Sequence, residues 1–263
     1  MENPVLSYTK QDLNDTTTVT VLEIDELSDS LRKYMDEHLA EICEGTYSDS
    51  LLVDVKDRIK ELFKDKQSDN TEVKYTNWEM GAVAEFFIHL YLKHHGLKQE
   101  CMFFNLEERS IKKGFDGYYT DESSPWIMES KSGSIDSEGA SHRSKIQEAM
   151  GDLKKKFSGQ GVKNNPWRNA FNHASHVDVG SANKLRTYLK QLSNDFTQKT
   201  AHDIDEFNII PCATIYYDET DFHTVDEIFD TVTAGHKPVG KSAHIICVSH
   251  RSVGVFKEYI GIE

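Results

Sequence analysis

An acidic pair and a lysine form the pattern in this chain that is best suited to chemistry. Asp116 stands in a Gly-Phe-Asp-Gly motif, and the triplet Glu129-Ser130-Lys131 begins thirteen positions later. Side chains two apart on a strand share a face, so Glu129 and Lys131 are expected to project together. Carboxylates on adjacent strands suit Mg²⁺, and a nearby lysine can orient a water or stabilise charge developing on phosphorus. The pattern therefore predicts a divalent-metal site.

The context of the triplet matters, because 28% of the residues are charged and such triplets usually mark a solvated strand face. Two apolar residues, Ile127 and Met128, lead directly into it. Residues 121–125 contain Asp, Ser and Pro and are typical of a turn. We therefore expect Asp116 on the strand before this turn and Glu129 on the strand after it.

A helix over residues 78–92 supplies a third acid. Its apolar residues recur at intervals of three and four, with Asn77 expected to cap its start and Gly96 to end it. Glu85 lies among apolar neighbours, so its carboxylate requires a cation, a hydrogen bond or a metal. Pairing with a nearby lysine is the alternative for Glu85. Glu79 is the other acid of this helix and is expected to be more exposed.

The order of these elements is similar to that of the PD-(D/E)xK nuclease superfamily: a helix with Glu, a strand with Asp, a strand with Glu-x-Lys, and a second helix. Residues 113–117 and 128–131, followed by a helix through Ile146, Ala149 and Leu153, resemble one branch. That branch is the HamA family, the nuclease subunits of the Hachiman antiphage defence system. The resemblance covers roughly residues 77–158, with a weaker match at 209–215. Phe115 replaces the proline that usually precedes the aspartate.

The resemblance implies a restriction-endonuclease-like α/β fold, with a central mixed sheet flanked by helices, and a metal-dependent DNase that works with a superfamily-2 helicase subunit. Asp116 and Glu129 would ligate Mg²⁺ or Mn²⁺, with the Ser130 carbonyl as a further ligand. Lys131 would orient the attacking water, and Glu85 would support a ligand water or a second metal. The implied reaction is in-line hydrolysis of a DNA phosphodiester.

Charge is unevenly distributed along the chain. The net charge of −14 opposes nonspecific DNA binding, which depends on phosphate contacts. Residues 142–168, however, hold seven Lys and Arg residues against two acids. A solvated helix face is one reading of this stretch. The other is a DNA-binding surface beside the metal site, made by Arg143, Lys145, Lys154, Lys155 and Lys156.

Composition narrows the class of protein. With 263 residues and an apolar fraction of 38%, the chain can bury a substantial core. No apolar run is long enough to cross a bilayer, and residues 1–15 lack the apolar core of a secretory signal, so we expect a cytoplasmic protein with no membrane partner. Four cysteines without C-x-x-C spacing indicate buried or incidental thiols rather than disulfides or zinc ligands.

The coarse organisation is an N-terminal α/β extension over residues 1–70, which could bind a partner, and a nuclease domain over residues 71–263. The polar segment 64–76 marks the boundary. The nuclease core spans 77–158, and later strands are expected to extend its sheet. Strands are predicted at 19–24, 209–217, 243–249 and 253–260, and further helices at 27–42, 51–63, 183–199 and 224–233.

Two other motifs invite functional readings. Residues 235–242 satisfy the P-loop pattern G-x-x-x-x-G-K-S, but a P-loop follows a strand and opens a helix, whereas a helix is expected before these residues and a strand after them. A helix-to-strand loop is the favoured reading. The pairs His94/His95 and His173/His176 lack further ligands at metal-site spacing, and surface or capping roles are favoured.

Three functions therefore compete with a defence DNase. The first is an inactive restriction-like module that binds and regulates a helicase. The second is a nuclease of the same fold that acts in restriction or repair. The third is an ATP-binding protein that uses Lys241. The acids and lysine of the metal motif favour an active enzyme.

Overall fold

The structure is a computed structural model that describes residues 5–66, 75–103, 114–121, 124–177, 183–217, 223–234, 239–249 and 252–262. Within these residues, seven strands form one sheet in the order β1-β2-β7-β6-β5-β4-β3. The strands are β1 (Ser7–Asn14), β2 (Thr17–Glu23), β3 (Lys98–Gln99), β4 (Gly117–Thr120), β5 (Pro125–Ser134), β6 (Asn208–Tyr216) and β7 (Ser242–Ser249).

The sheet is mixed. Its centre is parallel, because β2, β7, β6 and β5 pair side by side in the same direction. Antiparallel strands lie at both edges, β1 beside β2 and the pair β4 and β3 beside β5. The predicted α/β class with a mixed central sheet is confirmed, and the restriction-endonuclease-like classification stays a prediction.

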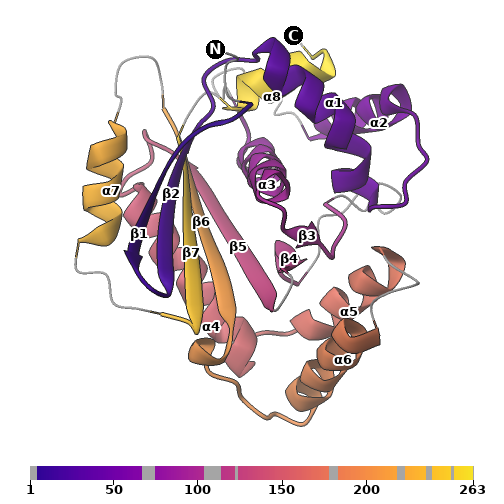
Figure 1. Ribbon diagram of the computed structural model, residues 1–263, viewed down its shortest axis with the longest axis vertical. Helices are drawn as coiled ribbons and strands as arrows, with labels where there is room; N and C mark the ends of the chain where they lie inside the picture. Colours follow the sequence, from indigo (N-terminus) through magenta and orange to yellow (C-terminus); the bar gives the residue numbers. More distant parts are fainter. Residues whose placement is uncertain are drawn as a thin grey trace.

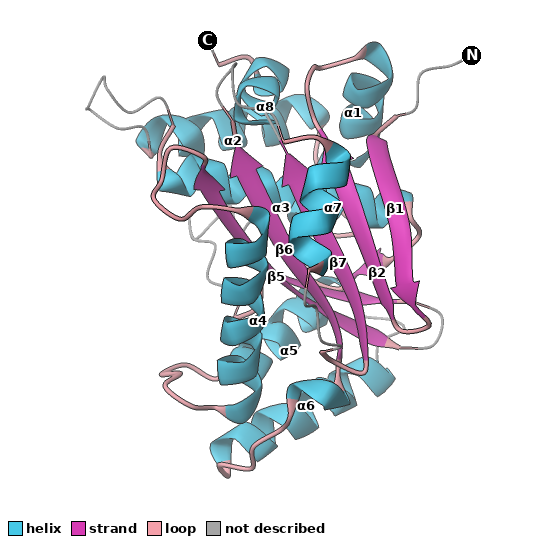
Figure 2. Ribbon diagram, turned by 90° about the vertical axis from the view of Figure 1, so that its left-hand side faces the viewer, coloured by secondary structure: helices cyan, strands magenta, loops and turns pink. Residues whose placement is uncertain are grey.

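Helices cover both faces of the sheet (Figures 1 and 2). On one face lie α1 (Asp29–Glu44), α2 (Leu52–Asp65), α3 (Asn77–His94) and α8 (Ser252–Ile260). On the other lie α4 (His142–Ser158) and α7 (Val225–Thr233). The pair α5 (Pro166–Val177) and α6 (Asn183–Thr197), with the short 3₁₀ helix η1 (Ile204–Glu206), packs near the start of the parallel strands.

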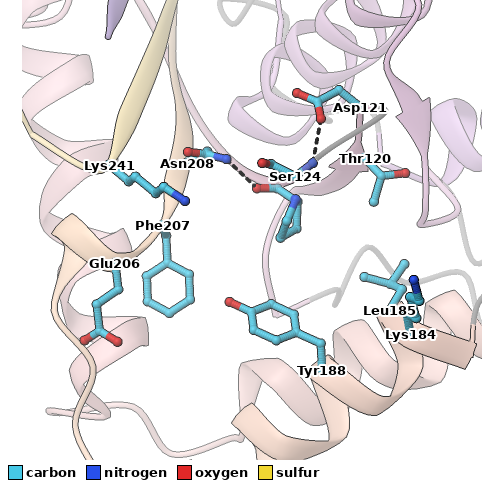
Figure 3. A pocket seen from close by; sticks show the side chains of 11 residues that line it. Thr120, Asp121, Ser124, Lys184, Leu185, Tyr188, Glu206, Phe207, Asn208 and Lys241 are labelled. Atoms are coloured by element: carbon cyan, nitrogen blue, oxygen red, sulfur yellow. Dashed lines mark hydrogen bonds between the residues drawn. The ribbon is translucent and has the colours of Figure 1, made fainter.

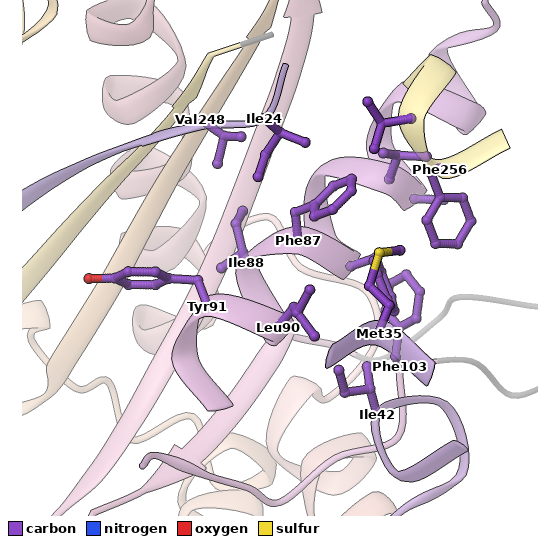
Figure 4. Packing of buried hydrophobic residues seen from close by; sticks show 14 of the residues in the cluster. Ile24, Met35, Ile42, Phe87, Ile88, Leu90, Tyr91, Phe103, Val248 and Phe256 are labelled. Carbon is purple, nitrogen blue, oxygen red and sulfur yellow. The ribbon is translucent and has the colours of Figure 1, made fainter. Parts of the chain in front are cut away.

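The central helix α3 is buried along most of its length. Figure 4 shows Phe87 and Ile88 of α3 between Val248 of the sheet and Phe256 of α8. Apolar residues therefore surround this helix instead of forming one stripe, as expected for a helix covered on both sides. This packing fixes the position of Glu85, which α3 carries.

The start of α3 differs from the sequence prediction in two ways. The N-cap is Thr76 rather than Asn77, because Thr76 and Glu79 form a reciprocal capping box. Glu79 is 2% exposed, so the prediction that it would be the more exposed acid was wrong. Its carboxylate also pairs with Lys257 of α8 at 3.3 Å, which gives it a structural role.

The C-terminal element predicted as a strand over 253–260 is the helix α8. Its buried residues include Val253, Phe256 and Ile260, spaced by three and four, which is the period of a helix face. The β-branched residues suggested a strand, but packing against α3 and α2 outweighs this local preference.

Two longer elements, β1 and α5, were not predicted, and neither were the two-residue strand β3 and the 3₁₀ helix η1. Strand β1 is almost entirely exposed, so its sequence lacks the alternation that marks a half-buried strand. Helix α5 begins at Pro166, directly after Asn165, whose side chain accepts a hydrogen bond from the Arg168 N–H at 3.1 Å. Asn followed by Pro is a recognised helix start, so α5 was predictable from the sequence.

The other predicted helices and strands are confirmed, with ends shifted by a few residues. Strands β1 and β2 belong to the same sheet as β7, and the residues 67–74 of the predicted boundary lie outside the described residues. The division into an N-terminal extension and a nuclease domain stays a prediction. All four cysteines are buried, as expected. Among the described helices, none has the length and apolar character needed to span a membrane.

Candidate active site

The Gly-Phe-Asp-Gly motif leads into β4 and is closely packed against neighbouring residues. Gly114 has a φ of +79°, and a Cβ there would lie 2.7 Å from the carbonyl oxygen of Pro166 at the start of α5. A Cβ on Gly117 would lie 2.7 Å from the Tyr119 ring. Phe115 between them packs on Trp167, with ring centroids 4.7 Å apart. Both glycines are therefore required by space, and together with Phe115 they hold the intervening aspartate in place. Lys113 lies outside the described residues.

Asp116 is positioned by β5. Asp116 was predicted to lie on a strand, but β4 begins only at Gly117, so Asp116 lies just outside it. Its Oδ2 accepts a hydrogen bond from the Ser130 N–H at 2.8 Å, which continues the contact with β5 beyond the last β4–β5 pair, Gly117 with Met128. The two predicted motifs are thus brought together by a direct bond. The turn between the strands is closed by Asp121, whose Oδ1 accepts from the Ser124 N–H at 2.6 Å.

Glu129 is the buried acid of the site, with 2% of its side chain exposed. Its Oε1 accepts from Lys131 Nζ at 2.9 Å, and its Oε2 accepts from Lys156 Nζ of α4 at 2.5 Å. Burial, and then the nearby charge of Asp116, raise the pKa of Glu129 to about 7, against the opposing effect of the two lysines. The predicted shared face of Glu129 and Lys131 is confirmed.

Lys131 is held between two acids. Its Nζ lies 2.9 Å from Glu129 and 2.9 Å from Oδ2 of Asp152 on α4. Burial alone would lower the pKa of Lys131, but Glu129 and Asp152 outweigh it and raise the pKa above its ordinary value. Lys131 is therefore a fixed cation at neutral pH, suited to orienting a water or a phosphate oxygen and unsuited to acting as a base.

Helix α4 runs antiparallel to β5 across the face that carries the E-x-K triplet. Asp152 and Lys156 are one helical turn apart and contact Lys131 and Glu129 respectively. In the sequence, Asp152 counted only as an acid within a basic stretch, and Lys156 was expected to bind DNA. Their spacing on the helix that follows the triplet was the available signal for this arrangement.

Glu85 approaches from the opposite face of the sheet. A Cβ on Gly81, one turn earlier on α3, would lie 3.9 Å from Oγ of Ser132 on β5. This helix face is therefore directed at β5, and the half-buried Glu85 shares it.

The buried thiol of Cys212 on β6 is within electrostatic range of all three acids. Burial raises its pKa well above the ordinary value, and Cys247, Asp116, Glu129 and Glu85 add to the effect. Three acids spread over residues 85 to 129 thus act electrostatically on one thiol.

The donor set suits a hard divalent cation. Because the N–H and C=O of one strand residue point to the same side, the Ser130 carbonyl shares the β5 edge where its N–H meets Asp116. Two carboxylates and one carbonyl leave room for water and substrate phosphate, as Mg²⁺ prefers. Within the described residues, no group of three His, Cys, Asp or Glu side chains is arranged to hold a metal ion.

The predicted DNA-binding residues of α4 fall into two groups. Arg143, Lys154 and Lys155 are exposed, with Lys155 paired to Asp152 at 3.1 Å. Lys145 and Lys156 turn toward β5 instead, and a Cβ on Gly133 would lie 3.0 Å from Lys145 Cε. The first group is available to a DNA backbone beside the site.

A cavity of about 470 Å³ lies apart from these residues (Figure 3). Tyr188 of α6 points toward Phe207, near the starts of β6 and β7, whereas Lys184 lies at the other end of the cavity, toward Thr120. Its lining reaches β5 only at the first residue of that strand, so the cavity is about 13 Å along the strand from the E-x-K triplet.

The two other motifs have structural explanations. Helix α7 precedes the P-loop-like segment and β7 follows it, which confirms the helix-to-strand order, while 235–238 lie outside the described residues. His94 and His95 are exposed at the end of α3, where His95 is the C-cap. His173 lies half-buried on α5, and the side chain of His176 lies outside the described residues.

Comparison with known proteins gives one result for nearly the whole chain. The model of the family described as HamA matches residues 2–260. No curated protein matches the sequence. The family match extends well beyond the residues 77–158 that carried the resemblance, and includes the N-terminal strands and α8.

Proposed function

The chain belongs to the HamA family, a component of the Hachiman antiphage defence system, and we propose that it is the metal-dependent deoxyribonuclease of that system. The observation that supports this most is the convergence of Asp116, Glu129 and Lys131 at the open edge of β5. An acidic pair beside a fixed cation is suited to hydrolysing phosphodiesters.

Each side chain of the site would have its own role in metal binding or hydrolysis. Asp116, Glu129 and the Ser130 carbonyl would hold Mg²⁺ or Mn²⁺, which would activate a water and neutralise charge on the phosphate. Lys131, fixed by its two acids, would donate a hydrogen bond to the attacking water or the scissile phosphate. Glu85 would accept from a ligand water on the α3 side or support a second metal. Cleavage would leave a 5′-phosphate and a 3′-hydroxyl.

The negative net charge of the molecule is consistent with a partner protein that brings DNA to it. The net charge of −14 weakens long-range attraction to DNA, and the exposed cations of α4 form a local exception. We infer that a superfamily-2 helicase subunit delivers DNA to the site and controls access to it.

Plasmid cleavage tests the proposal. Wild type would be compared with Glu129→Ala/Lys131→Ala and with Asp116→Asn, in Mg²⁺, Mn²⁺ or EDTA, with and without the helicase subunit. Asparagine keeps an acceptor for the Ser130 N–H, so Asp116→Asn removes charge with little structural change. We expect metal-dependent cutting by wild type and at least a hundredfold loss in both variants, the size typical of lost charge stabilisation.

Other outcomes would assign another function. If wild type cuts nothing under any of these conditions but binds the helicase, the chain is an inactive regulatory module. If both variants cut as wild type does, the activity lies elsewhere in the chain or in a contaminant.

A further inference from the structure

Lys156 occupies an unusual position for a residue of a basic helix. Its ammonium lies 2.5 Å from Glu129 Oε2, and its side chain is 20% exposed. Its Nζ also lies 5.6 Å from the centroid of the buried Phe115 ring. Lys156 therefore packs inside the site, between α4 and the Gly-Phe-Asp-Gly motif, instead of extending into solvent as a DNA-tracking lysine would.

Both oxygens of Glu129 are already in use. Oε1 accepts from Lys131 and Oε2 accepts from Lys156. A divalent cation that binds this carboxylate competes with one of the two ammonium groups, because like charges in a buried site repel strongly. One of the two lysines must therefore move away from Glu129 when a metal ion binds.

The two lysines differ in how they are held. Lys131 has a second anion, Asp152, at 2.9 Å, and Asp152 is itself paired with Lys155. Among the residues that the structure describes, Lys156 has Glu129 as its single ion-pair partner. Its unbranched stem allows the ammonium to swing away without moving the helix.

We propose that Lys156 is the internal counter-ion of the metal site: its ammonium neutralises Glu129 until a divalent cation displaces it, while Asp152 keeps Lys131 in place. This inference rests on the proposed metal-dependent function. It assigns α4 a role in setting how tightly the site takes its metal, in addition to any contact with DNA.

Mn²⁺ binding to the full-length chain, followed by electron paramagnetic resonance, tests the proposal without a cleavage assay. Lys156→Met removes the competing cation, so it should bind Mn²⁺ at least about tenfold more tightly than wild type, the size of one charged hydrogen bond. Lys190→Met, an exposed residue of α6 with the same charge change, should bind as wild type does. The metal-free Lys156→Met chain should also melt at a lower temperature, because its buried carboxylate has lost a partner.

A second variant covers the case in which Lys156→Met does not fold. Lys156→Arg retains the charge and offers a two-pronged donor to Glu129, so it should bind Mn²⁺ more weakly than wild type. Mn²⁺ affinity that is unchanged or lower in Lys156→Met, or unchanged or higher in Lys156→Arg, overturns the proposal. Lower affinity for DNA with unchanged Mn²⁺ affinity would make Lys156 a phosphate contact only. If wild type neither binds Mn²⁺ nor cuts plasmid, the proposed function and this inference both fail. If wild type does both, the Mn²⁺ affinities of the Lys156 variants test this inference alone.

Discussion

At the scale of single residues, two lysines and one aspartate act on the buried carboxylate of Glu129. Burial and Asp116 favour its neutral form, whereas Lys131 and Lys156 favour the ionised form, and burial prevails. A divalent cation would reverse this balance, because it stabilises the ionised form directly. The charge state of Glu129 therefore links folding, pH and metal binding.

The pH dependence of stability should show this link. The pKa of Glu129 is about 7 in the folded chain against an ordinary value of 4.5. The folded chain holds a proton that the unfolded chain releases between these values. The contribution of Glu129 to stability is therefore complete below pH 4.5 and is lost as the pH rises through about 7.

Chemical unfolding in EDTA, measured across this range for wild type and Glu129→Gln, isolates the effect. The free energy of unfolding of wild type should fall relative to the variant as the pH rises, by on the order of 2–3 kcal/mol. A difference between the two proteins that is constant with pH would show that the carboxyl titrates normally.

At this scale, the sequence was enough to predict Asp116, Glu129 and Lys131 as neighbours. The period of a strand predicts a shared face for Glu129 and Lys131, and these two side chains are hydrogen-bonded in the structure. The Gly-Phe-Asp-Gly motif before the turn was expected beside them, and Asp116 accepts a hydrogen bond from the Ser130 N–H. The contacts of Asp152 and Lys156 with them depend on how α4 lies across β5, which local periodicity does not specify.

At the scale of elements, α3 carries two acids with different tasks. Glu79 caps its own helix and pairs with Lys257 of α8, whereas Glu85 faces β5 near the other acids. The sequence alone ranked them wrongly for exposure, because α8 was taken for a strand and its lysine could not be placed over Glu79.

Paired substitutions on α3 should separate the two tasks. Glu79→Gln should lower the free energy of unfolding by about 1–2 kcal/mol, because it removes one side of a buried ion pair, and leave cleavage per folded molecule unchanged. Glu85→Gln should reduce cleavage with a smaller effect on stability. Unfolding curves and plasmid assays on the same preparations measure both, and full cleavage by Glu85→Gln would remove that residue from the proposed site.

The loop before β4 permits a test of backbone geometry. Gly114→Ala should lower the free energy of unfolding by about 1–3 kcal/mol, because the alanine is strained at positive φ and meets the Pro166 backbone. Gly139→Ala is the matched control, since Gly139 has a φ of +73° with open space around it. Equal losses measured by thermal unfolding would show that the contact with α5 contributes nothing.

At the scale of the whole molecule, one mixed sheet separates the helices that carry Glu85 and the α4 cations. Strong periodicity was enough to predict most of its helices and the parallel strands. The exposed β1, with its irregular pattern, and the docked α8 depended on tertiary neighbours. The family match over residues 2–260 now includes these elements as well.

The exposed cations of α4 on an acidic molecule predict where DNA binds. Arg143→Gln/Lys154→Gln should weaken binding to a DNA duplex and flatten its salt dependence, by roughly 0.9 in the log–log slope for each phosphate that is no longer neutralised. Fluorescence anisotropy over a range of salt concentrations measures the slope. Lys184→Gln/Lys190→Gln on α6 makes the same charge change as a control. An unchanged slope in Arg143→Gln/Lys154→Gln, or an equal fall in both double variants, would show that DNA makes no preferred contact with α4.

We propose that the edge of β5 between Asp116 and Glu129 is the metal centre of a nuclease. Anomalous diffraction from crystals containing Mn²⁺ tests it most directly. We expect a single strong peak in contact with both carboxylates and the Ser130 carbonyl, and its loss in Asp116→Asn crystals. A peak at other residues, or none at Mn²⁺ concentrations that support DNA cleavage, would contradict this assignment of the metal centre.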